Sequence, residues 1–547
     1  MRPMRERPWD RLWPDDVPRT IDYPARPAWW ILRRNLPRHA DRPAIRLVDP
    51  ETADERGLLT YADLSARCSA FAAGLGGAGV RRGDRVAFFL PNSPALITAY
   101  FGTWLAGAAG VPCNPMSRAA ELEYQLSDAA ASLLLTSGAL YPVAAGVAER
   151  LGIPLFVAPG GATTEPAPDE LPDGAVPWTE LLGSGDDVEP AAVDPSDGLA
   201  LLLYTGGTTG VPKGAMLTHR NIVANTVQFA AWYGFEDGRE TCISTLPLFH
   251  SGGMAGAMNV PLYAGATLVL FERFRPAGVA RAIGRYGCTR FFGVPTMYAA
   301  VLNLPDCRDY DLSSLRACRT SAAPLPAAVK ARFDDLAGRE ILVEGYGLSE
   351  TSPLAIANPV HRPKAGAIGI PLSDTDAAVV DPLTGVEVPR GEPGELVLRG
   401  PQVMLGYWRK PDETAAAFRD GWFHTGDIAR LDEQGYFQII DRLKDVINTA
   451  GYKVWPREVE EVLYAHPAVQ LAAVVGAPDA YRGETVKAFV VLREDADGVT
   501  AGDLVAYCRE RLALYKVPRE VEFREALPMS GAGKVLRRLL RRRAAPP

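Results

Sequence analysis

The sequence lacks the features that mark several common classes of protein. Its seven cysteines are odd in number, lie far apart and form no Cys-x-x-Cys pair, so neither a disulfide framework nor a zinc site is indicated. Acidic residues outnumber Lys and Arg by 65 to 58, and the net charge of −7 argues against nucleic acid as a partner. Scattered cysteines suit a reducing compartment, and we expect a cytoplasmic protein.

Long hydrophobic runs are also missing. A membrane-spanning helix needs roughly 20 consecutive apolar residues, but the longest candidate, 94–112, is broken by Gly, Pro and polar residues. Residues 1–27 mix Arg, Asp, Pro and Trp and contain no apolar core of the kind that a secretory signal has. We therefore expect at most a peripheral contact with the inner face of a membrane, for which the basic segment 537–543 is the candidate.

The composition is that of a globular protein, with 47% hydrophobic and 22% charged residues. Its 547 residues exceed one ordinary domain. Short apolar segments alternate with helical patterns through the first two-thirds, and this βαβ order predicts an α/β fold of mainly parallel sheets covered by helices. The predicted strands are 86–90, 132–135, 155–157, 199–203, 266–271 and 395–398, and the predicted helices are 95–105, 143–151 and one from about 221.

A charged segment, Asp441–Asp445, separates the last part of the chain from the rest. Downstream lie a helix that begins near Pro456, apolar runs at 471–475 and 486–492, and a second helix over 504–512. Roughly 100 residues suffice for a separate α+β domain. We predict a large N-terminal domain over 1–440, an exposed hinge over 441–445 and a small, mobile C-terminal domain over 446–547.

The most informative segment is 204–214, which reads Tyr-Thr-Gly-Gly-Thr-Thr-Gly-Val-Pro-Lys-Gly. It follows a predicted strand and precedes a predicted helix. Glycines let successive backbone N–H groups point into one concavity, and the hydroxyl groups and the lysine add donors for an anion. The spacing differs from that of a Walker A loop, because Gly214 and not Ser or Thr follows Lys213. The segment alone predicts either a phosphate-binding loop or a flexible surface loop.

Five further motifs follow in a fixed order. They are Pro-Leu-Phe-His-Ser-Gly-Gly at 247–253, Glu-Gly-Tyr-Gly-Leu-Ser-Glu-Thr at 344–351, Gly-Trp-Phe-His-Thr-Gly-Asp at 421–427, Asp-Arg-Leu-Lys-Asp at 441–445 and Pro-Met-Ser-Gly-Ala-Gly-Lys at 528–534. With the glycine-rich loop, they make the whole chain resemble the adenylate-forming superfamily of acyl-CoA synthetases, nonribosomal adenylation domains and luciferases. The segments 454–463 and 481–491 are most similar to bacterial long-chain fatty acid:CoA ligases.

The resemblance implies a reaction in two steps that uses ATP, Mg²⁺ and coenzyme A. A carboxylate attacks the α-phosphorus of ATP to form an acyl-AMP and pyrophosphate, and the thiol of CoA then displaces AMP. Glu350 would hold Mg²⁺ and Thr351 would donate to the α-phosphate, whereas Glu350 taken alone would be a solvated loop carboxylate. The residues implied at the β- and γ-phosphates are Thr205, Gly206, Gly207, Thr208, Thr209 and Lys213.

The same resemblance implies how the nucleoside is bound. Asp427 would accept hydrogen bonds from both ribose hydroxyls, and Arg442 would help to hold the ribose; Asp427 alone would be a turn residue that satisfies its own backbone. Tyr346 would stack on adenine, although its pattern also fits a core residue. The remaining residues implied around the nucleotide are Ala322, Ala323, Glu344 and Gly345.

Two half-reactions require two arrangements of the small domain, as the resemblance implies. Lys534 would bridge the acyl carboxylate and the phosphate, where it stabilises charge that develops in the transition state; the alternative is one more cation of the solvated basic run 534–543. Lys444 would be the hinge residue, and the glycine of Gly451-Tyr452 would leave room for CoA after the domain turns.

The acyl pocket implied by the resemblance contains no Arg or Lys that could bind a second carboxylate. Glycines leave volume there, which favours a medium- to long-chain fatty acid. His250 would lie at the carboxylate end, with a structural histidine as the alternative, and His424 is interpreted as structural. The residues implied to line the pocket are Gly252, Gly253, Met254, Val294, Met297 and Thr320.

Three other functions stay open. An aryl-CoA ligase would share every catalytic motif. An acyl-AMP ligase would need a carrier protein in trans, because no carrier motif follows within the sequence. A non-catalytic lipid-binding homologue is disfavoured by the intact Lys534 and Glu350. The expected partners are therefore a small carboxylic acid, ATP and CoA; nothing sets the oligomeric state, and a homodimer is compatible with the sequence.

Overall fold

The computed structural model describes residues 7–162, 171–184, 188–205, 211–449, 452–479, 482–493, 496, 498–529 and 535–544. Contacts divide the chain into two compact units. The large unit comprises Arg7–Asp376 and Leu398–Phe423, and the small unit comprises Ala377–Val397 together with the chain from His424 onward. The small unit therefore includes two segments that precede the predicted hinge at 441–445, and that hinge stays a prediction.

The first sheet of the large unit has nine strands in the order β15-β14-β13-β12-β11-β9-β10-β1-β2. Its six central strands are parallel, and antiparallel pairs close both edges. The strands are β1 (Pro43–Val48), β2 (Glu55–Thr60), β9 (Thr241–Ser244), β10 (Thr267–Leu270), β11 (Arg290–Gly293), β12 (Ala317–Thr320), β13 (Leu342–Gly347), β14 (Leu354–Ala357) and β15 (Ile370–Pro371).

The second sheet has seven strands in the order β18-β8-β7-β4-β3-β5-β6. Strands β7, β4, β3, β5 and β6 run parallel, and β8 and β18 add antiparallel pairs at one side. The strands are β3 (Arg85–Phe89), β4 (Ala109–Pro112), β5 (Leu133–Thr136), β6 (Leu155–Val157), β7 (Leu199–Thr205), β8 (Lys213–Thr218) and β18 (Gly406–Tyr407). The α/β class and the predominantly parallel sheets predicted from the sequence are confirmed.

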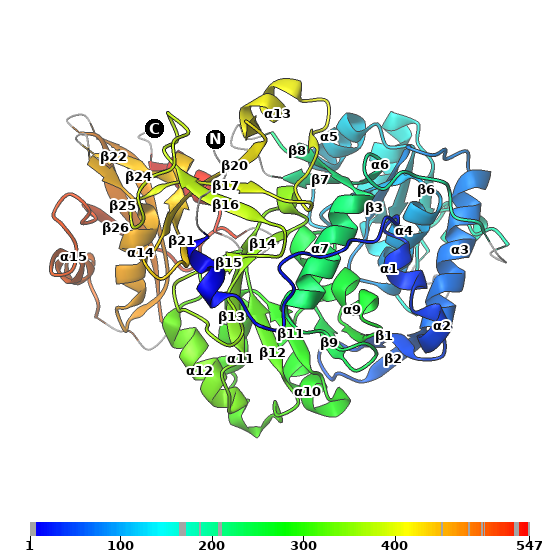
Figure 1. Ribbon diagram of the computed structural model, residues 1–547, viewed down its shortest axis with the longest axis horizontal. Coiled ribbons are helices and arrows are strands. Elements are labelled where there is room, and N and C mark those ends of the chain that lie inside the picture. The colour runs from blue at the N-terminus through cyan, green and yellow to red at the C-terminus, as the bar shows by residue number, and fades with distance from the viewer. Residues whose placement is uncertain are drawn as a thin grey trace. The chain divides into compact units, whose positions relative to one another are not determined.

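Helices cover both sheets, and α7 and α9 lie between them (Figure 1). Helix α7 begins where Thr218 and Asn221 exchange side-chain and backbone hydrogen bonds in a capping box, and it is buried along most of its length. The helices of this unit are α1 (Trp30–Arg33), α2 (Leu36–His39), α3 (Tyr61–Gly77), α4 (Pro94–Leu105), α5 (Ala119–Ala129), α6 (Tyr141–Leu151), α7 (His219–Trp232), α8 (Ser251–Met254), α9 (Val260–Tyr263), α10 (Pro276–Tyr286), α11 (Pro295–Leu302), α12 (Ala327–Ala337) and α13 (Pro411–Ala417).

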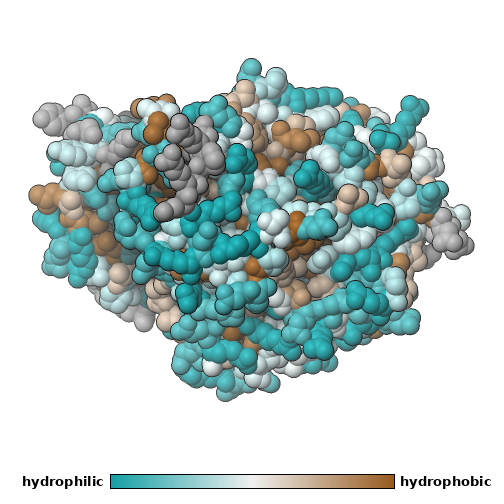
Figure 2. Space-filling view, viewed as in Figure 1, coloured by the Kyte–Doolittle hydropathy of each residue, from teal (hydrophilic) through white to brown (hydrophobic). Residues whose placement is uncertain are grey.

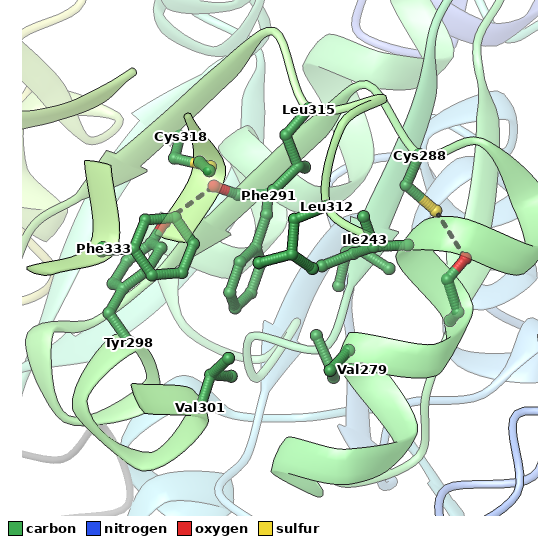
Figure 3. Close-up of a cluster of buried hydrophobic side chains, with 14 of the residues drawn as sticks. Ile243, Val279, Cys288, Phe291, Tyr298, Val301, Leu312, Leu315, Cys318 and Phe333 are labelled. Atoms are coloured by element: carbon green, nitrogen blue, oxygen red, sulfur yellow. Dashed lines mark hydrogen bonds between the residues drawn. The ribbon is translucent and has the colours of Figure 1, made fainter. Parts of the chain in front are cut away.

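An apolar cluster fills the space between the nine-stranded sheet and helices α10, α11 and α12 (Figure 3). Phe291 and Cys318, from adjacent strands, pack there against Tyr298 and Phe333. The Tyr298 hydroxyl donates to the carbonyl oxygens of Phe291 and Arg319, at 2.7 and 2.8 Å, so this polar atom is satisfied inside the core. Phe291 and Cys318 therefore mark the face of the sheet that points away from α7.

The small unit contains most of the remaining strands and the last three helices, whereas β19 and the terminal residues of β16, β17 and β20 belong to the large unit. One sheet has the order β16-β17-β20-β19, with β21 paired to β20, and a second has the order β23-β22-β25-β24, with β26 paired to β25. Their bounds are β16 (Asp376–Val380), β17 (Gly394–Arg399), β19 (Phe418–Arg419), β20 (Trp422–Leu431), β21 (Phe437–Arg442), β22 (Ile447–Thr449), β23 (Tyr452–Val454), β24 (Val469–Asp479), β25 (Gly483–Leu492) and β26 (Glu520–Phe523), and the helices are α14 (Pro456–Tyr464), α15 (Ala501–Arg509) and α16 (Arg537–Ala544).

Two expectations about exposed charge are wrong. Asp441 and Asp445 of the predicted hinge are only 4% and 7% exposed, although a charged connector is usually solvated. Arg537, from the basic run expected to be a solvated helix face, lies 2.6 Å from a Glu460 carboxylate oxygen, 3.4 Å from one of Asp445 and 3.7 Å from one of Asp441. Opposite charges from separate segments thus pair inside the small unit.

The surface is mainly hydrophilic in the view of Figure 2, with small apolar areas scattered across it. No helix among the described residues is both long enough and apolar enough to cross a membrane.

Candidate active site

The glycine-rich loop joins two antiparallel strands of the seven-stranded sheet. Strand β7 ends at Thr205 and β8 begins at Lys213, and these two residues pair directly at the base of the loop. The loop residues Gly206, Gly207, Thr208 and Thr209 lie outside the described residues. A Cβ at Gly214 would lie 3.3 Å from the Tyr204 ring and 3.5 Å from the Cβ of Trp408, so a small residue suits the close packing there.

Glu350 lies next to this base. It belongs to a short 3₁₀ turn, Ser349–Thr351, that follows β13, and it is 9% exposed. Its Oε1 accepts a hydrogen bond of 3.0 Å from the Tyr407 hydroxyl and a longer one of 3.5 Å from Thr205 Oγ1. The structure thus brings Thr205 and Glu350 together, although 145 positions separate them in the chain.

Tyr407 is a member of this cluster that no sequence motif indicates. Burial and the neighbouring Glu350 carboxylate raise the pKa of Tyr407, so its hydroxyl remains a donor. Lys213 Nζ lies 5.3 Å from the centroid of the Tyr407 ring, within the range of a cation–π contact. Tyr407 therefore connects the cation at the loop base with the carboxylate after β13.

Thr351 shapes the turn that presents Glu350. Its side chain is buried, and Oγ1 accepts from the Leu348 N–H at 3.0 Å and donates toward the carbonyl oxygens of Leu348 and Pro353. Ser352, which follows, adopts a left-handed conformation with φ 67°. Contact of Thr351 with an α-phosphate stays a prediction.

The predicted nucleotide residues lie after β12 and in the second half of β13, toward the carboxyl ends of these parallel strands, where ligands bind in open α/β sheets. Ala322 has φ 75°, a conformation that residues other than glycine rarely adopt. Ala323 belongs to the same turn. Glu344 is buried, with Oε2 accepting from the Leu325 N–H at 3.3 Å. Tyr346 is half-buried, so it is not a fully enclosed core side chain.

The glycines on the two sides of Tyr346 differ in how closely their neighbours approach. A Cβ at Gly347 would stand 1.7 Å from the carbonyl oxygen of Pro353, and a Cβ at Gly345 would stand 3.0 Å from Arg319 Nε. At Gly347 the end of β13 thus passes closer to its neighbour than a side chain would allow, whereas at Gly345 the Arg319 side chain would have to shift slightly.

His250 stands at the start of α8 and is half-buried, with its ring centroid 4.6 Å from that of Phe249. The next residue, Ser251, has its Oγ 3.4 Å from Ser349 Oγ, so the turn that carries Glu350 and the start of α8 are neighbours. His250 and Glu350 therefore belong to adjacent segments.

The predicted acyl-pocket residues differ in their surroundings. A Cβ at Gly252 would meet no atom within 4 Å, whereas one at Gly253 would lie 2.1 Å from the Pro247 carbonyl oxygen. Gly252 thus faces open space, and Gly253 is needed for packing. Met254, Val294 and Thr320 are buried, and Met297 packs partly against the apolar cluster of Figure 3.

The pocket segments contain no Arg or Lys, but Arg319 precedes Thr320 on β12. It is 4% exposed, and its guanidinium faces Phe229 and Tyr233. The sequence around Arg319 is that of an ordinary strand and does not indicate that its side chain is buried against aromatic rings.

Asp427 and Arg442 face each other across β20 and β21 in the small unit. Arg442 Nε lies 3.3 Å from Asp427 Oδ1, and Asp427 is 5% exposed. His424 Nδ1 lies 2.8 Å from Glu395 Oε2, which matches its interpretation as a structural residue.

The predicted hinge and CoA residues are described only in part. Lys444 lies in a 3₁₀ turn, Leu443–Asp445, and its side chain, like Gly451 and Lys534, is outside the described residues. Tyr452 is 58% exposed and stacks on Tyr515 with ring centroids 4.7 Å apart.

Comparison with known proteins decides the family. The model of the AMP-binding enzyme family matches residues 32–408, and the model of the AMP-binding enzyme C-terminal domain matches residues 458–534. This chain belongs to the AMP-binding enzyme family. It is an AMP-forming acyl-CoA synthetase, and the resemblance found in its motifs is confirmed.

Similar proteins include ligases for aliphatic and for aromatic acids. A long-chain-fatty-acid–CoA ligase of Bacillus subtilis (strain 168) is 40% identical over 558 residues, which cover 98% of each chain. A feruloyl-CoA synthase of an Amycolatopsis species is 41% identical over 488 residues, covering 89% of this chain and 94% of the relative. The solved anthranilate CoA ligase AuaEII, in complex with anthranoyl-AMP, superimposes with a TM-score of 0.85 at 30% identity, covering 95% of this chain and 98% of that structure.

Proposed function

We propose that the protein is an ATP-dependent acid:CoA ligase that activates a medium- to long-chain fatty acid. The acid's carboxylate oxygen attacks the α-phosphorus of ATP and releases pyrophosphate, and the CoA thiol then attacks the acyl carbon and releases AMP. The observation that carries the proposal is the cluster of Thr205, Glu350 and Tyr407 beside the glycine-rich loop. It provides donors for phosphate and one carboxylate for a cation at the same place.

The cluster fits Mg²⁺ bound together with nucleotide. Mg²⁺ is held in such sites by one or two carboxylates, phosphate oxygens and water, and when bound it neutralises phosphate charge. Glu350 is buried and uses Oε1 for the Tyr407 hydroxyl, which fixes the orientation of the carboxylate. Lys213 and Thr205 supply the donors that the β- and γ-phosphates need.

The nucleoside residues follow the same proposal. Asp427 accepts from the ribose hydroxyls, and Arg442 holds the Asp427 carboxylate from the adjacent strand. Tyr346 stacks on adenine, against the turn that contains Ala322 and Ala323. The left-handed backbone of Ala322 supports a specialised turn at this position.

Catalysis and domain rotation are assigned on the motifs. Lys534 bridges the acyl carboxylate and the α-phosphate during adenylation. The C-terminal domain then turns about the hinge at Lys444. This rotation brings the loop with Gly451 and Tyr452 to the active site, where the glycine leaves room for CoA. The exposed Tyr452 ring supports a role in contact with a ligand. We also assign the enzyme to the cytoplasm, where ATP and CoA are available.

The acyl pocket is best explained by an apolar chain. Gly252 faces open space, and buried Met254 and Val294 supply apolar walls. The long-chain-fatty-acid–CoA ligase of Bacillus subtilis supports this substrate. An aryl acid is the second candidate, because the feruloyl-CoA synthase is equally similar over most of the chain.

Pyrophosphate release tests the proposal. The enzyme is supplied with ATP and Mg²⁺ and with straight-chain acids from short to long, cinnamic acid or benzoic acid, with and without CoA. We expect sustained turnover on medium to long chains only when CoA is present. A burst without CoA-dependent turnover would point to a carrier protein as acceptor, and preference for the aryl acids would replace the fatty acid but keep the mechanism.

A further inference from the structure

Arg319 lies on the face of the nine-stranded sheet that points toward α7. Side chains alternate along a strand, and the residue before it, Cys318, faces the opposite side in the apolar cluster of Figure 3. Arg319 is paired in register with Phe292 of β11 and Val343 of β13. Its guanidinium carbon lies 4.5 Å from the ring centroid of Phe229 on α7. The cation is therefore enclosed between the sheet and α7.

Nothing among the described residues accepts a hydrogen bond from this guanidinium. Arg319 is 4% exposed, its Nε has no partner, and no carboxylate oxygen of the described chain lies within 4 Å of it. Burial lowers its pKa, but an arginine stays protonated at neutral pH. Stacking on Phe229 and Tyr233 compensates only in part for the lost water.

A second buried arginine of the same sheet, Arg290, shows how such a cation is usually compensated by hydrogen-bond acceptors. Arg290 on β11 is also 4% exposed, and its Nε, like that of Arg319, has no partner among the described residues. Its terminal nitrogens, however, donate to the carbonyl oxygens of Tyr233 and Gly234 and pair with Glu240 at 2.8 Å. Buried cations are normally compensated in this way. Arg319 has no such partner among the described residues, so the part of the chain that the structure describes does not supply its acceptor.

A further unsatisfied donor lies beside Arg319. The buried hydroxyl of Tyr233 has no partner among the described residues. A Cβ at Gly345 would lie 3.0 Å from Arg319 Nε and 3.3 Å from the Tyr233 oxygen, so both groups border the space that this glycine leaves. Burial raises the pKa of Tyr233 to about 12, and its hydroxyl remains a donor at neutral pH. Two donors without acceptors thus face one place.

This place adjoins the predicted acyl pocket. Thr320, the next residue on β12, is also assigned to the pocket, but by the same alternation its side chain points to the opposite face, so the link comes from the helical side. On the helical side, a Cβ at Gly256 would lie 3.3 Å from the Phe229 ring, and Gly256 belongs to the segment that follows Gly252 and Met254. Phe229, on which Arg319 stacks, therefore packs against the segment that is predicted to line the pocket.

We propose that Arg319 and Tyr233 form the inner end of the acyl pocket and bind an oxygen acceptor at the distal end of the acid. The inference rests on the proposed ligase function and refines its substrate. The acid carries a carboxylate, hydroxyl or carbonyl oxygen at the end far from the reacting carboxylate. A plain alkyl chain would leave both donors buried and unsatisfied, whereas an acceptor oxygen satisfies them.

Matched pairs of acids test the proposal. The pairs are dodecanoic with dodecanedioic acid and cinnamic with 4-hydroxycinnamic acid, and kcat/KM is measured as CoA-dependent AMP formation. The wild type is expected to prefer the oxygen-bearing member of at least one pair by about 10-fold or more. Preference within the aliphatic pair identifies a carboxylate as the acceptor, and preference within the aromatic pair identifies a ring hydroxyl.

Variants separate binding from folding. Arg319→Met should lower kcat/KM for the preferred acid by about 10- to 100-fold and change the unsubstituted partner by less than about 3-fold. Tyr233→Phe keeps the ring packing, and it should lower kcat/KM for the preferred acid by about 5-fold without changing kcat/KM for its unsubstituted partner. Arg537→Met in the small unit is the control, because loss of its ion pair with Glu460 should lower the melting temperature without changing the preference between paired acids.

Two results would overturn the inference. One is a wild type that prefers the unsubstituted member of both pairs. The other is an equal loss for all acids in Arg319→Met, together with an unchanged preference in Tyr233→Phe. Failure of the ligase function is distinguishable, since no acid would then support CoA-dependent AMP formation. In that case, the increase in melting temperature that each acid causes on binding still shows which member of a pair binds more tightly.

Discussion

Asp441 makes the stability of the small unit depend on pH. Its carboxylate is 4% exposed and accepts from the backbone N–H groups of Arg442 and Arg457, each at 2.7 Å. Burial outweighs these bonds and the nearby Arg537, and it raises the pKa of Asp441 from 3.8 to about 6. The unfolded state therefore loses this proton near pH 4 and the folded state only near pH 6.

The sign and size of the effect follow from linkage. Between these values the folded state binds more protons than the unfolded state, so the contribution of Asp441 to stability is largest below pH 4 and falls as the pH rises to 6. A shift of about two pKa units corresponds to roughly 3 kcal/mol. Asp441→Asn keeps a neutral acceptor for the backbone donors and should remove this component.

Hydrogen exchange of the β24–β25 amides measures the effect directly. The opening free energy is compared between wild type and Asp441→Asn from pH 4 to 7. We expect the difference between the two proteins to change by about 3 kcal/mol across this range, in favour of the variant as the pH rises. Glu525→Gln, an exposed carboxylate of the same unit, is the control and should follow the wild type. Parallel curves for wild type and Asp441→Asn would refute the reasoning.

Three further substitutions test the ion pairs and the phosphate site. Glu350→Gln should lower the adenylation rate by about 100-fold without a change in melting temperature, and ATP–pyrophosphate exchange measures this; a rate within 3-fold of wild type would exclude Glu350 from the site. Tyr407→Phe removes the 3.0 Å bond to Glu350 and should weaken Mg²⁺ activation by about 10-fold, seen in the Mg²⁺ dependence of the same exchange; an unchanged dependence would contradict the link. Arg537→Met leaves Glu460 buried without its cation, while Asp445 keeps Arg541 at 3.2 Å, and should cost about 3 kcal/mol or more, measured by urea unfolding at neutral pH; a loss below about 1 kcal/mol would show that the pairing is not stabilising.

Local patterns were sufficient for the architecture. Leu155–Val157 matches strand β6 completely, and the helix predicted to open at Pro456 is α14. Each strand or helix can be predicted because the pattern of apolar residues that it buries lies within a few neighbouring positions. The alternation of such strands and helices along the chain then predicts parallel sheets. The ends of elements shift by a few positions; for example, the second helix of the small unit covers Ala501–Arg509 and not 504–512.

Contacts between distant segments were beyond these patterns. Tyr407 reaches Glu350 across 57 positions, and nothing in Gly406-Tyr407-Trp408 indicates this. Arg537 is half-buried beside Asp441, Asp445 and Glu460, which come from separate segments of the small unit. A basic run and a charged connector look solvated when each is taken alone. Arg319 likewise looks like an ordinary strand residue in the sequence, because its burial depends on the packing of the sheet against α7.

Transfer of oxygen from the acid to AMP tests the central claim most directly. The enzyme is given an acid labelled with ¹⁸O in its carboxylate, together with ATP, Mg²⁺ and CoA, and the AMP and pyrophosphate are analysed by mass spectrometry. Attack of the carboxylate on the α-phosphorus predicts one ¹⁸O atom in each AMP and none in pyrophosphate, with one acyl-CoA formed per AMP. Unlabelled AMP, or label in pyrophosphate or phosphate, would contradict the account.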